Sequence, residues 1–183
     1  KQYLERIYGG SQEDYYSILK KDLSCESKRF IITANPEILV MSEKDNQISA
    51  MLLDPQTNLI PDGIAVVKAC KMLNIPVTEK IAGVETADFL LKEANRQSKS
   101  LYLFGASNEV IELLVKNIAD CYPNINLLGY SNGYVQDKEK VFEEISALSP
   151  DICMVALGVP AQEKLIYKHL HKFNKGIFIG VGG

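Results

Sequence analysis

From residue 29 onward the sequence alternates short runs rich in β-branched and aromatic residues with longer segments of helical period. The runs that predict strands are residues 29–33, 59–60, 100–104, 125–128, 152–157 and 176–181. Strands separated by helices pair in parallel through right-handed crossovers, and this places helices on both faces of the sheet. The sequence therefore predicts an α/β fold built on an open, mostly parallel, Rossmann-like sheet.

Capping residues indicate where the intervening helices begin. Asn35 followed by Pro36 is typical of an N-cap and a first helical position. The helix that starts there is expected to run to Leu52, with an irregularity around Asp45. The segment 64–73 is apolar on every side, which predicts a buried helix.

The length of 183 residues fits a single domain. We assign residues 29–183 to one α/β domain. Residues 1–28 carry helical patterns broken at Gly9-Gly10 and are expected to form an N-terminal helical extension. The chain does not begin with Met, and we expect the natural protein to continue beyond Gly183.

Charge and hydropathy exclude two classes of partner. The net charge is −3 and no run of basic residues is longer than two, whereas a protein that binds nucleic-acid phosphates should be clearly basic somewhere. The longest apolar stretch, residues 152–159, is far shorter than the roughly 18 residues that span a bilayer. We therefore expect no nucleic-acid partner and no membrane-spanning segment.

The residues that commonly bind metals are scattered. The four cysteines contain no C-x-x-C pair and are interpreted as small core residues in a reducing compartment. His169 and His171 lie two positions apart on an expected helix, so they point to different sides and cannot share a zinc ion. The sequence predicts no metal site and no cofactor.

Turns rich in glycine and small polar residues follow the expected strands. Ligands of open parallel sheets bind outside the carboxyl ends of the strands, where helix N-termini favour anions. These turns therefore predict a nucleotide-type ligand such as a diphosphate. They are Thr33-Ala34-Asn35-Pro36, Pro61-Asp62-Gly63, Gly105-Ala106-Ser107, Ser131-Asn132-Gly133-Tyr134, Gly158-Val159-Pro160-Ala161-Gln162-Glu163 and Gly180-Val181-Gly182-Gly183.

Each of these polar residues also fits a purely structural role. Asp62 lies in Pro-Asp-Gly, which is a common turn. Thr33 and Asn35 fit helix capping, and Gln162 and Glu163 fit the first turn of a helix, where the dipole favours acidic and polar groups.

Gly105 and Gly158 likewise fit the relief of steric conflict at a strand end as well as they fit a ligand site.

Motifs that the sequence lacks narrow the class of protein. The sequence contains no G-x-G-x-x-G after a strand, no G-x-x-x-x-G-K-[ST] and no G-x-S-x-G. The absence of these motifs therefore disfavours an ordinary dinucleotide-binding protein, a P-loop protein or a serine hydrolase.

The order of the turns from about residue 29 to the end resembles that of the WecG/TagA/CpsF glycosyltransferase family. Its most specific pieces are T-x-N at Thr33 to Asn35, P-D-G at Pro61 to Gly63, and A-L-G-x-P-x-Q-E-K at Ala156 to Lys164. The resemblance implies an inverting, metal-independent transferase. Such an enzyme moves a sugar, N-acetylmannosamine or a related hexose, from a UDP-sugar to a polyprenyl-diphosphate-linked saccharide during synthesis of teichoic acid or surface polysaccharide.

The resemblance also implies roles for particular residues. Asp62 matches the family's proposed catalytic base, and Thr33, Asn35 and Gln162 match residues that hold substrate. A carboxylate at a strand end can take the proton of an acceptor hydroxyl, and Gln162 can offer both halves of its amide to the sugar. Lys80 stands where the family commonly has arginine, and it keeps the charge but loses the bidentate fork.

The remaining substrate-binding candidates are Gly105, Gly133, Tyr134 and Gly158. No D-x-D motif is present to hold a metal on a diphosphate, so helix N-termini and cationic side chains must supply the positive potential.

The implied partners are a UDP-sugar donor, a lipid-linked saccharide acceptor and a membrane surface contacted through a segment beyond Gly183. The implied location is cytoplasmic, peripheral to the inner face of the cell membrane. The oligomeric state stays open, a homo-oligomer included. Two alternatives also stay open, a nucleotide-dependent α/β oxidoreductase with a degenerate phosphate loop and a non-catalytic module that binds sugar nucleotides.

Overall fold

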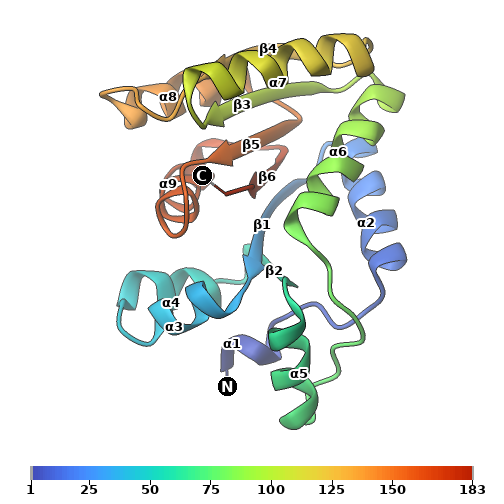
Figure 1. Cartoon of the computed structure of the whole chain (residues 1–183), viewed down its shortest axis with the longest axis vertical. Helices are drawn as coiled ribbons and strands as arrows, with labels where there is room; N and C mark the ends of the chain where they lie inside the picture. Colours follow the sequence, from blue (N-terminus) through green and yellow to red (C-terminus); the bar gives the residue numbers. More distant parts are fainter. Residues whose placement is uncertain (1, 183) are drawn as a thin grey trace.

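The computed structural model of the chain describes residues 2–182, so Lys1 of the expected extension and Gly183 of the closing turn lie outside the described residues. Its centre is a parallel sheet of six strands in the order β2-β1-β6-β5-β3-β4 (Figure 1). The strands are β1 (Lys28–Ala34), β2 (Thr57–Pro61), β3 (Ser100–Gly105), β4 (Asn126–Ser131), β5 (Ile152–Ala156) and β6 (Gly176–Gly180). The expected open parallel α/β sheet is confirmed.

Helices cover both faces of this sheet. Apolar side chains of α3, α4, α5, α8 and α9 pack on one face, and those of α2, α6 and α7 pack on the other. Within the described residues the helices are α1 (Gln2–Glu5), α2 (Gln12–Ser24), α3 (Pro36–Ser42), α4 (Asn46–Leu53), α5 (Ile64–Met72), α6 (Gly83–Gln97), α7 (Asn108–Cys121), α8 (Lys138–Leu148), α9 (Ala161–His169) and the short 3₁₀ helix η1 (Leu170–Lys172).

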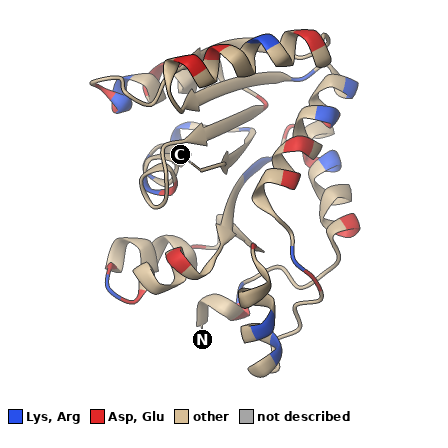
Figure 2. Cartoon of the chain, viewed as in Figure 1, with Lys and Arg blue, Asp and Glu red and all other residues tan. Residues whose placement is uncertain are grey.

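Alternation along the strands supplies both layers of the core. On β1, Phe30 and Ile32 pack with the first group of helices and Ile31 packs with the second, and all three side chains are fully buried. Burial of each such side chain contributes about 1.5–3 kcal/mol. Charged residues of both signs lie along the helices and few lie on the strands (Figure 2). The sheet is therefore covered on both faces, as parallel sheets usually are.

The prediction of one helix from Pro36 to Leu52 is wrong, because two helices cover this segment. α3 ends at Ser42, and Asp45 caps α4 by accepting hydrogen bonds from the backbone N–H groups of Gln47 and Ile48, at 2.8 and 3.3 Å. A side chain that satisfies the first N–H groups of a helix favours a new start over continuation.

The prediction that segment 64–73 is a buried helix is also wrong. Val66, Val67 and Cys70 of α5 are buried, but Ile64 and Met72 are 65% and 84% exposed. One side of α5 packs into the core beside the edge strand β2, and the opposite side faces solvent.

The prediction for the cysteines holds in part. Cys70 and Cys153 are buried, as expected of small core residues, and burial raises the pKa of the Cys153 thiol. Cys25 and Cys121 are exposed at the ends of α2 and α7, so their assignment to the core is wrong.

The expected N-terminal helices are present as α1 and α2, separated by the Gly9-Gly10 break. Between them Ile7 forms a single parallel bridge with Leu59 of β2, and the Tyr8 N–H donates to the Leu59 carbonyl at 2.8 Å. Arg6 donates to the Leu52 carbonyl and to Thr57. This segment therefore packs on the edge strand.

Among the described residues, no helix is both long enough and apolar enough to cross a bilayer.

Candidate active site

A cleft of about 220 Å³ lies at the carboxyl ends of β1, β2 and β6. Four of the residues expected to act on substrate contribute to it, because parallel strands end at the same edge of a sheet. Its lining residues are Thr33, Asn35, Asp62, Ala82, Gly83, Val84, Val159, Gln162, Gly180, Val181 and Gly182.

Asp62 directly follows β2. Its backbone N–H donates to the Ala34 carbonyl at 3.2 Å, and Gly63 completes the turn with a φ of 102°, a conformation that favours glycine. The half-exposed carboxylate makes no hydrogen bond or ion pair with the described residues and is the one charged side chain among those that line the cleft. Both oxygens can therefore accept a proton from a ligand, or a hydrogen bond from one of its hydroxyl groups.

Thr33 is held against the start of α6. A Cβ on Gly83 would lie 2.6 Å from the Cγ2 of Thr33 and 3.7 Å from a carboxylate oxygen of Asp62. Only glycine at position 83 lets the start of α6 approach Thr33 this closely. No role was assigned to Ala82 and Gly83 from the sequence, so their contribution to the cleft was missed.

Asn35 has the structural role that its position also suggested. Its Oδ1 accepts a hydrogen bond from the backbone N–H of Ile38 at 2.9 Å and so caps α3. The amide nitrogen is left as the group that can donate into the cleft.

Gln162 is 1% exposed in the first turn of α9. Its Oε1 accepts from the backbone N–H groups of Leu157 and Gly182, at 3.3 and 3.2 Å, and its Nε2 donates to Oε1 of Glu163 at 2.8 Å. Two N–H donors on one side require an acceptor there, which fixes the amide orientation. The expectation that both halves of the amide serve the sugar is therefore wrong, since only the second N–H of Nε2 is left for a ligand.

Glu163 accepts a hydrogen bond from Gln162 of the cleft, a role that the sequence analysis did not assign to it. It is 1% exposed, its Oε2 is buried without a hydrogen-bond partner, and burial raises the pKa of its carboxyl. Gly180 makes room for this pair, because a Cβ there would lie 2.4 Å from Nε2 of Gln162 and 2.8 Å from Oε1 of Glu163. A glutamate in a first helical turn is ordinarily exposed, so the sequence carried no signal of this burial.

We expect Glu163→Gln to change how stability depends on pH. A carboxyl whose pKa is raised in the folded state stabilises the fold below its ordinary pKa and loses that contribution as pH rises through the folded value. The substituted amide cannot ionise but keeps an acceptor for Gln162. The free energy of unfolding of the variant, relative to the parent, should therefore increase as pH rises above the ordinary pKa of a glutamate carboxyl, as measured in urea titrations. The exposed Glu144→Gln is the control, and a flat difference for Glu163→Gln would contradict the expectation.

Gly105 and Gly133 lie outside the cleft, where they pack against backbone and core. A Cβ on Gly105 would lie 2.2 Å from the carbonyl oxygen of Ala156 on the neighbouring strand β5. The Gly133 N–H donates to the Ala106 carbonyl at 2.8 Å, and a Cβ on it would lie 3.1 Å from Leu157. The contact at Gly105 fits the steric role that the sequence also allowed for it.

Three further candidates lie away from the cleft lining. Tyr134 is 82% exposed, and its backbone N–H donates to the side chain of Asn132. Gly158 has a φ of 77°, and its carbonyl accepts from the Gln162 N–H at the start of α9. Lys80 is exposed two residues before Ala82 of the cleft wall. In residues 2–182 no group of three or more His, Cys, Asp or Glu side chains is placed to hold a metal ion.

The model of the Glycosyl transferase WecG/TagA/CpsF family matches residues 6–183 of this chain. The chain belongs to this family. The resemblance inferred from the strand-end turns is thus confirmed, and the family match begins earlier in the chain than residue 29. Asp62, Thr33 and Gln162, the residues to which the resemblance assigned roles, line the same cleft.

Curated relatives share the name N-acetylglucosaminyldiphosphoundecaprenol N-acetyl-beta-D-mannosaminyltransferase. The one from Bacillus subtilis (strain 168) is 41% identical over 84% of this chain and 59% of its own length. Those from Bacillus spizizenii and Staphylococcus aureus (strain NCTC 8325 / PS 47) are 37% and 36% identical, each over 84% of this chain and 60% of their own length. The matched part of the chain thus spans about three fifths of each relative.

Proposed function

We propose that the cleft transfers N-acetylmannosamine or a related hexose from a UDP-sugar to an N-acetylglucosaminyl-diphosphate-polyprenol acceptor, with inversion at the anomeric carbon. The observation that carries this proposal is the gathering of Asp62, Thr33 and Gln162 in one cleft of a chain that belongs to this family. The names of the relatives support the sugar and the acceptor.

Asp62 acts as the general base in this mechanism. Its carboxylate takes the proton of the acceptor hydroxyl while that oxygen attacks the anomeric carbon, and the bond from that carbon to the UDP oxygen breaks on the opposite face. The second N–H of Gln162 and the hydroxyl of Thr33 hold the donor. Because Leu157, Gly182 and Glu163 fix the Gln162 amide, its donor is oriented before substrate arrives.

The departing diphosphate needs positive potential. The first turn of α6 begins at the cleft wall, and its N–H groups have no intrahelical acceptor. Lys80, just before this wall in the chain, is our candidate cation. The acceptor is lipid-linked, so we place the reaction at the cytoplasmic face of the membrane, with membrane contact made by a segment outside the matched region.

A transfer assay with the full-length protein tests this function. We expect N-acetylmannosamine to pass from its UDP derivative to an N-acetylglucosaminyl-diphosphate acceptor, and we expect the rate to survive an excess of EDTA, because the cleft offers a divalent ion one carboxylate. A strict requirement for added Mn²⁺ would contradict metal independence. Saturable binding of a nicotinamide cofactor without binding of UDP would instead support the oxidoreductase alternative.

A further inference from the structure

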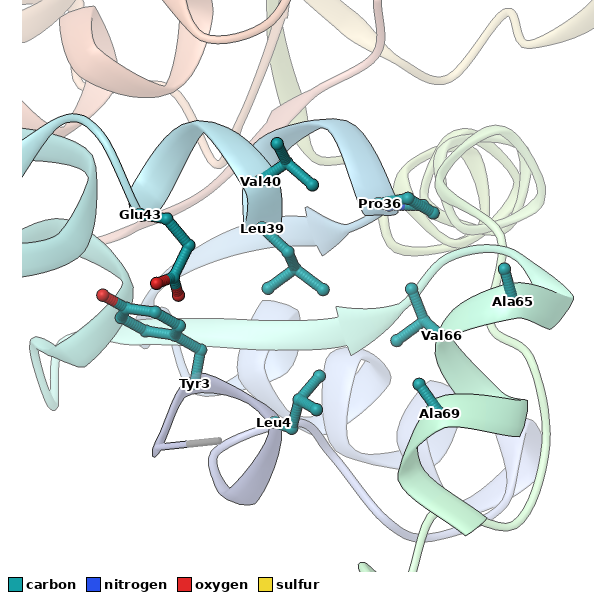
Figure 3. A pocket seen from close by; sticks show the side chains of 9 residues that line it. All are labelled: Tyr3, Leu4, Pro36, Leu39, Val40, Glu43, Ala65, Val66 and Ala69. Carbon is teal, nitrogen blue, oxygen red and sulfur yellow. The ribbon is translucent and has the colours of Figure 1, made fainter. Parts of the chain in front are cut away.

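An apolar groove of about 300 Å³ lies between α3 and α5, with α1 beneath it (Figure 3). Its lining is apolar except for the hydroxyl of Tyr3 and the carboxylate of Glu43. The lining residues are Tyr3, Leu4, Pro36, Leu39, Val40, Glu43, Ala65, Val66 and Ala69. Figure 3 shows the side chains of Leu4, Leu39 and Val66 directed toward the middle of the groove.

One end of the groove meets the candidate active site. Pro36 of the groove directly follows Asn35 of the cleft, and Ala65 lies three residues after Asp62. In Figure 3 Pro36 and Ala65 lie at the end toward which the strand arrows point, and Tyr3 and Glu43 lie at the other end. The single carboxylate of the groove is thus far from the end that adjoins the cleft.

We propose that this groove binds the isoprenoid segment of the acceptor that is next to its diphosphate, while the saccharide lies in the cleft. The inference rests on the proposed function. The relatives' named acceptor carries a saccharide, a diphosphate and a polyprenol in one linear molecule, so its apolar chain must leave the cleft beside the diphosphate. The groove offers apolar surface at that place.

The shape of the groove favours a flexible chain over a protein partner. Three helices enclose it, and the 61% exposed Val40 stands at its rim. A stable protein interface buries about 800 Å² on each partner, whereas a hollow of this volume suits a narrow apolar chain. Burial of isoprenoid carbons here removes apolar surface of both molecules from water.

Kinetics with two acceptors test the proposal in the full-length protein. One acceptor carries a farnesyl tail on its N-acetylglucosaminyl diphosphate, and the other carries a short water-soluble tail. Ala69→Phe fills the groove, and Val40→Glu places a charge at its rim. Each should raise the KM for the farnesyl acceptor by about tenfold, the cost of about two fewer buried CH₂ groups. The KM for the short-tailed acceptor and the affinity for UDP should not change.

Controls separate this effect from misfolding. Ala147→Phe makes the same change on the exposed side of α8 and should leave both KM values unchanged. Val40→Glu alters an exposed residue, so it keeps the test valid if Ala69→Phe fails to fold. Equal KM shifts for the two acceptors, no shift for either, or a change of oligomeric state in the groove variants would overturn the proposal.

A photoreactive farnesyl-diphosphate acceptor distinguishes this proposal from the proposed function. Crosslinks should map to α3 and α5. Crosslinks there without transfer from any UDP-sugar would support the groove and contradict the function. Transfer with crosslinks confined to other elements would support the function and overturn the groove.

Discussion

Asp62→Asn is expected to lower the rate of sugar transfer about 10²- to 10⁴-fold, because the amide keeps the shape of the side chain but cannot accept the proton of the acceptor hydroxyl. The carboxylate makes no bond with the described residues, so its replacement should leave the fold intact. The affinity for UDP, measured as ligand-induced thermal stabilisation, should change little. The loss should appear in kcat with the full-length protein.

Asp120→Asn provides the matched control for Asp62→Asn. Asp120 lies exposed on α7, so the same change of chemistry there should leave the rate unaltered. If Asp62→Asn retains more than half of the parent rate, Asp62 only shapes the turn before Gly63, and the general-base mechanism is wrong.

The sequence predicted the strands and helices well because the short apolar runs of the strands differ clearly from the helical period of the segments between them. All six expected strands are present, and the cap expected at Asn35 holds as the N-cap of α3. The break between α3 and α4 is a local effect of the Asp45 cap, whereas the error at α5 originates in tertiary context. Which side of α5 is covered depends on β2 being an edge strand, and nothing local to residues 64–73 indicates that position.

The same limit applies to the candidate site. The sequence identified which residues follow strands, but the order of the strands decides which of them meet. Thr33 lies at the carboxyl end of β1 and Asp62 follows its neighbour β2, whereas Gly105 ends β3 and Gly133 follows β4 at the far side of the sheet. Gln162 reaches the cleft because α9 begins beside β6, which pairs with β1. The strand order follows from long-range pairing, which local pattern does not encode.

Gly105→Ala should be among the most destabilising single changes in this chain, since two separate penalties coincide there. The φ of Gly105 is 124°, a conformation that costs other residues about 1–2 kcal/mol. The added Cβ would also lie 2.2 Å from the Ala156 carbonyl oxygen, an overpacking that costs about 1–3 kcal/mol. We therefore expect the free energy of unfolding to fall by about 2–5 kcal/mol in urea or guanidinium titrations.

Gly158→Ala separates the two penalties of Gly105→Ala. Gly158 has a positive φ of 77°, but no atom lies within 4 Å of the position of a Cβ, so this variant should lose only the backbone part, about 1–2 kcal/mol. A larger loss for Gly105→Ala than for Gly158→Ala assigns the excess to the contact between β3 and β5. Equal losses would show that this contact relaxes. In that case the positive φ of Gly105, without the steric contact, would account for glycine at this position.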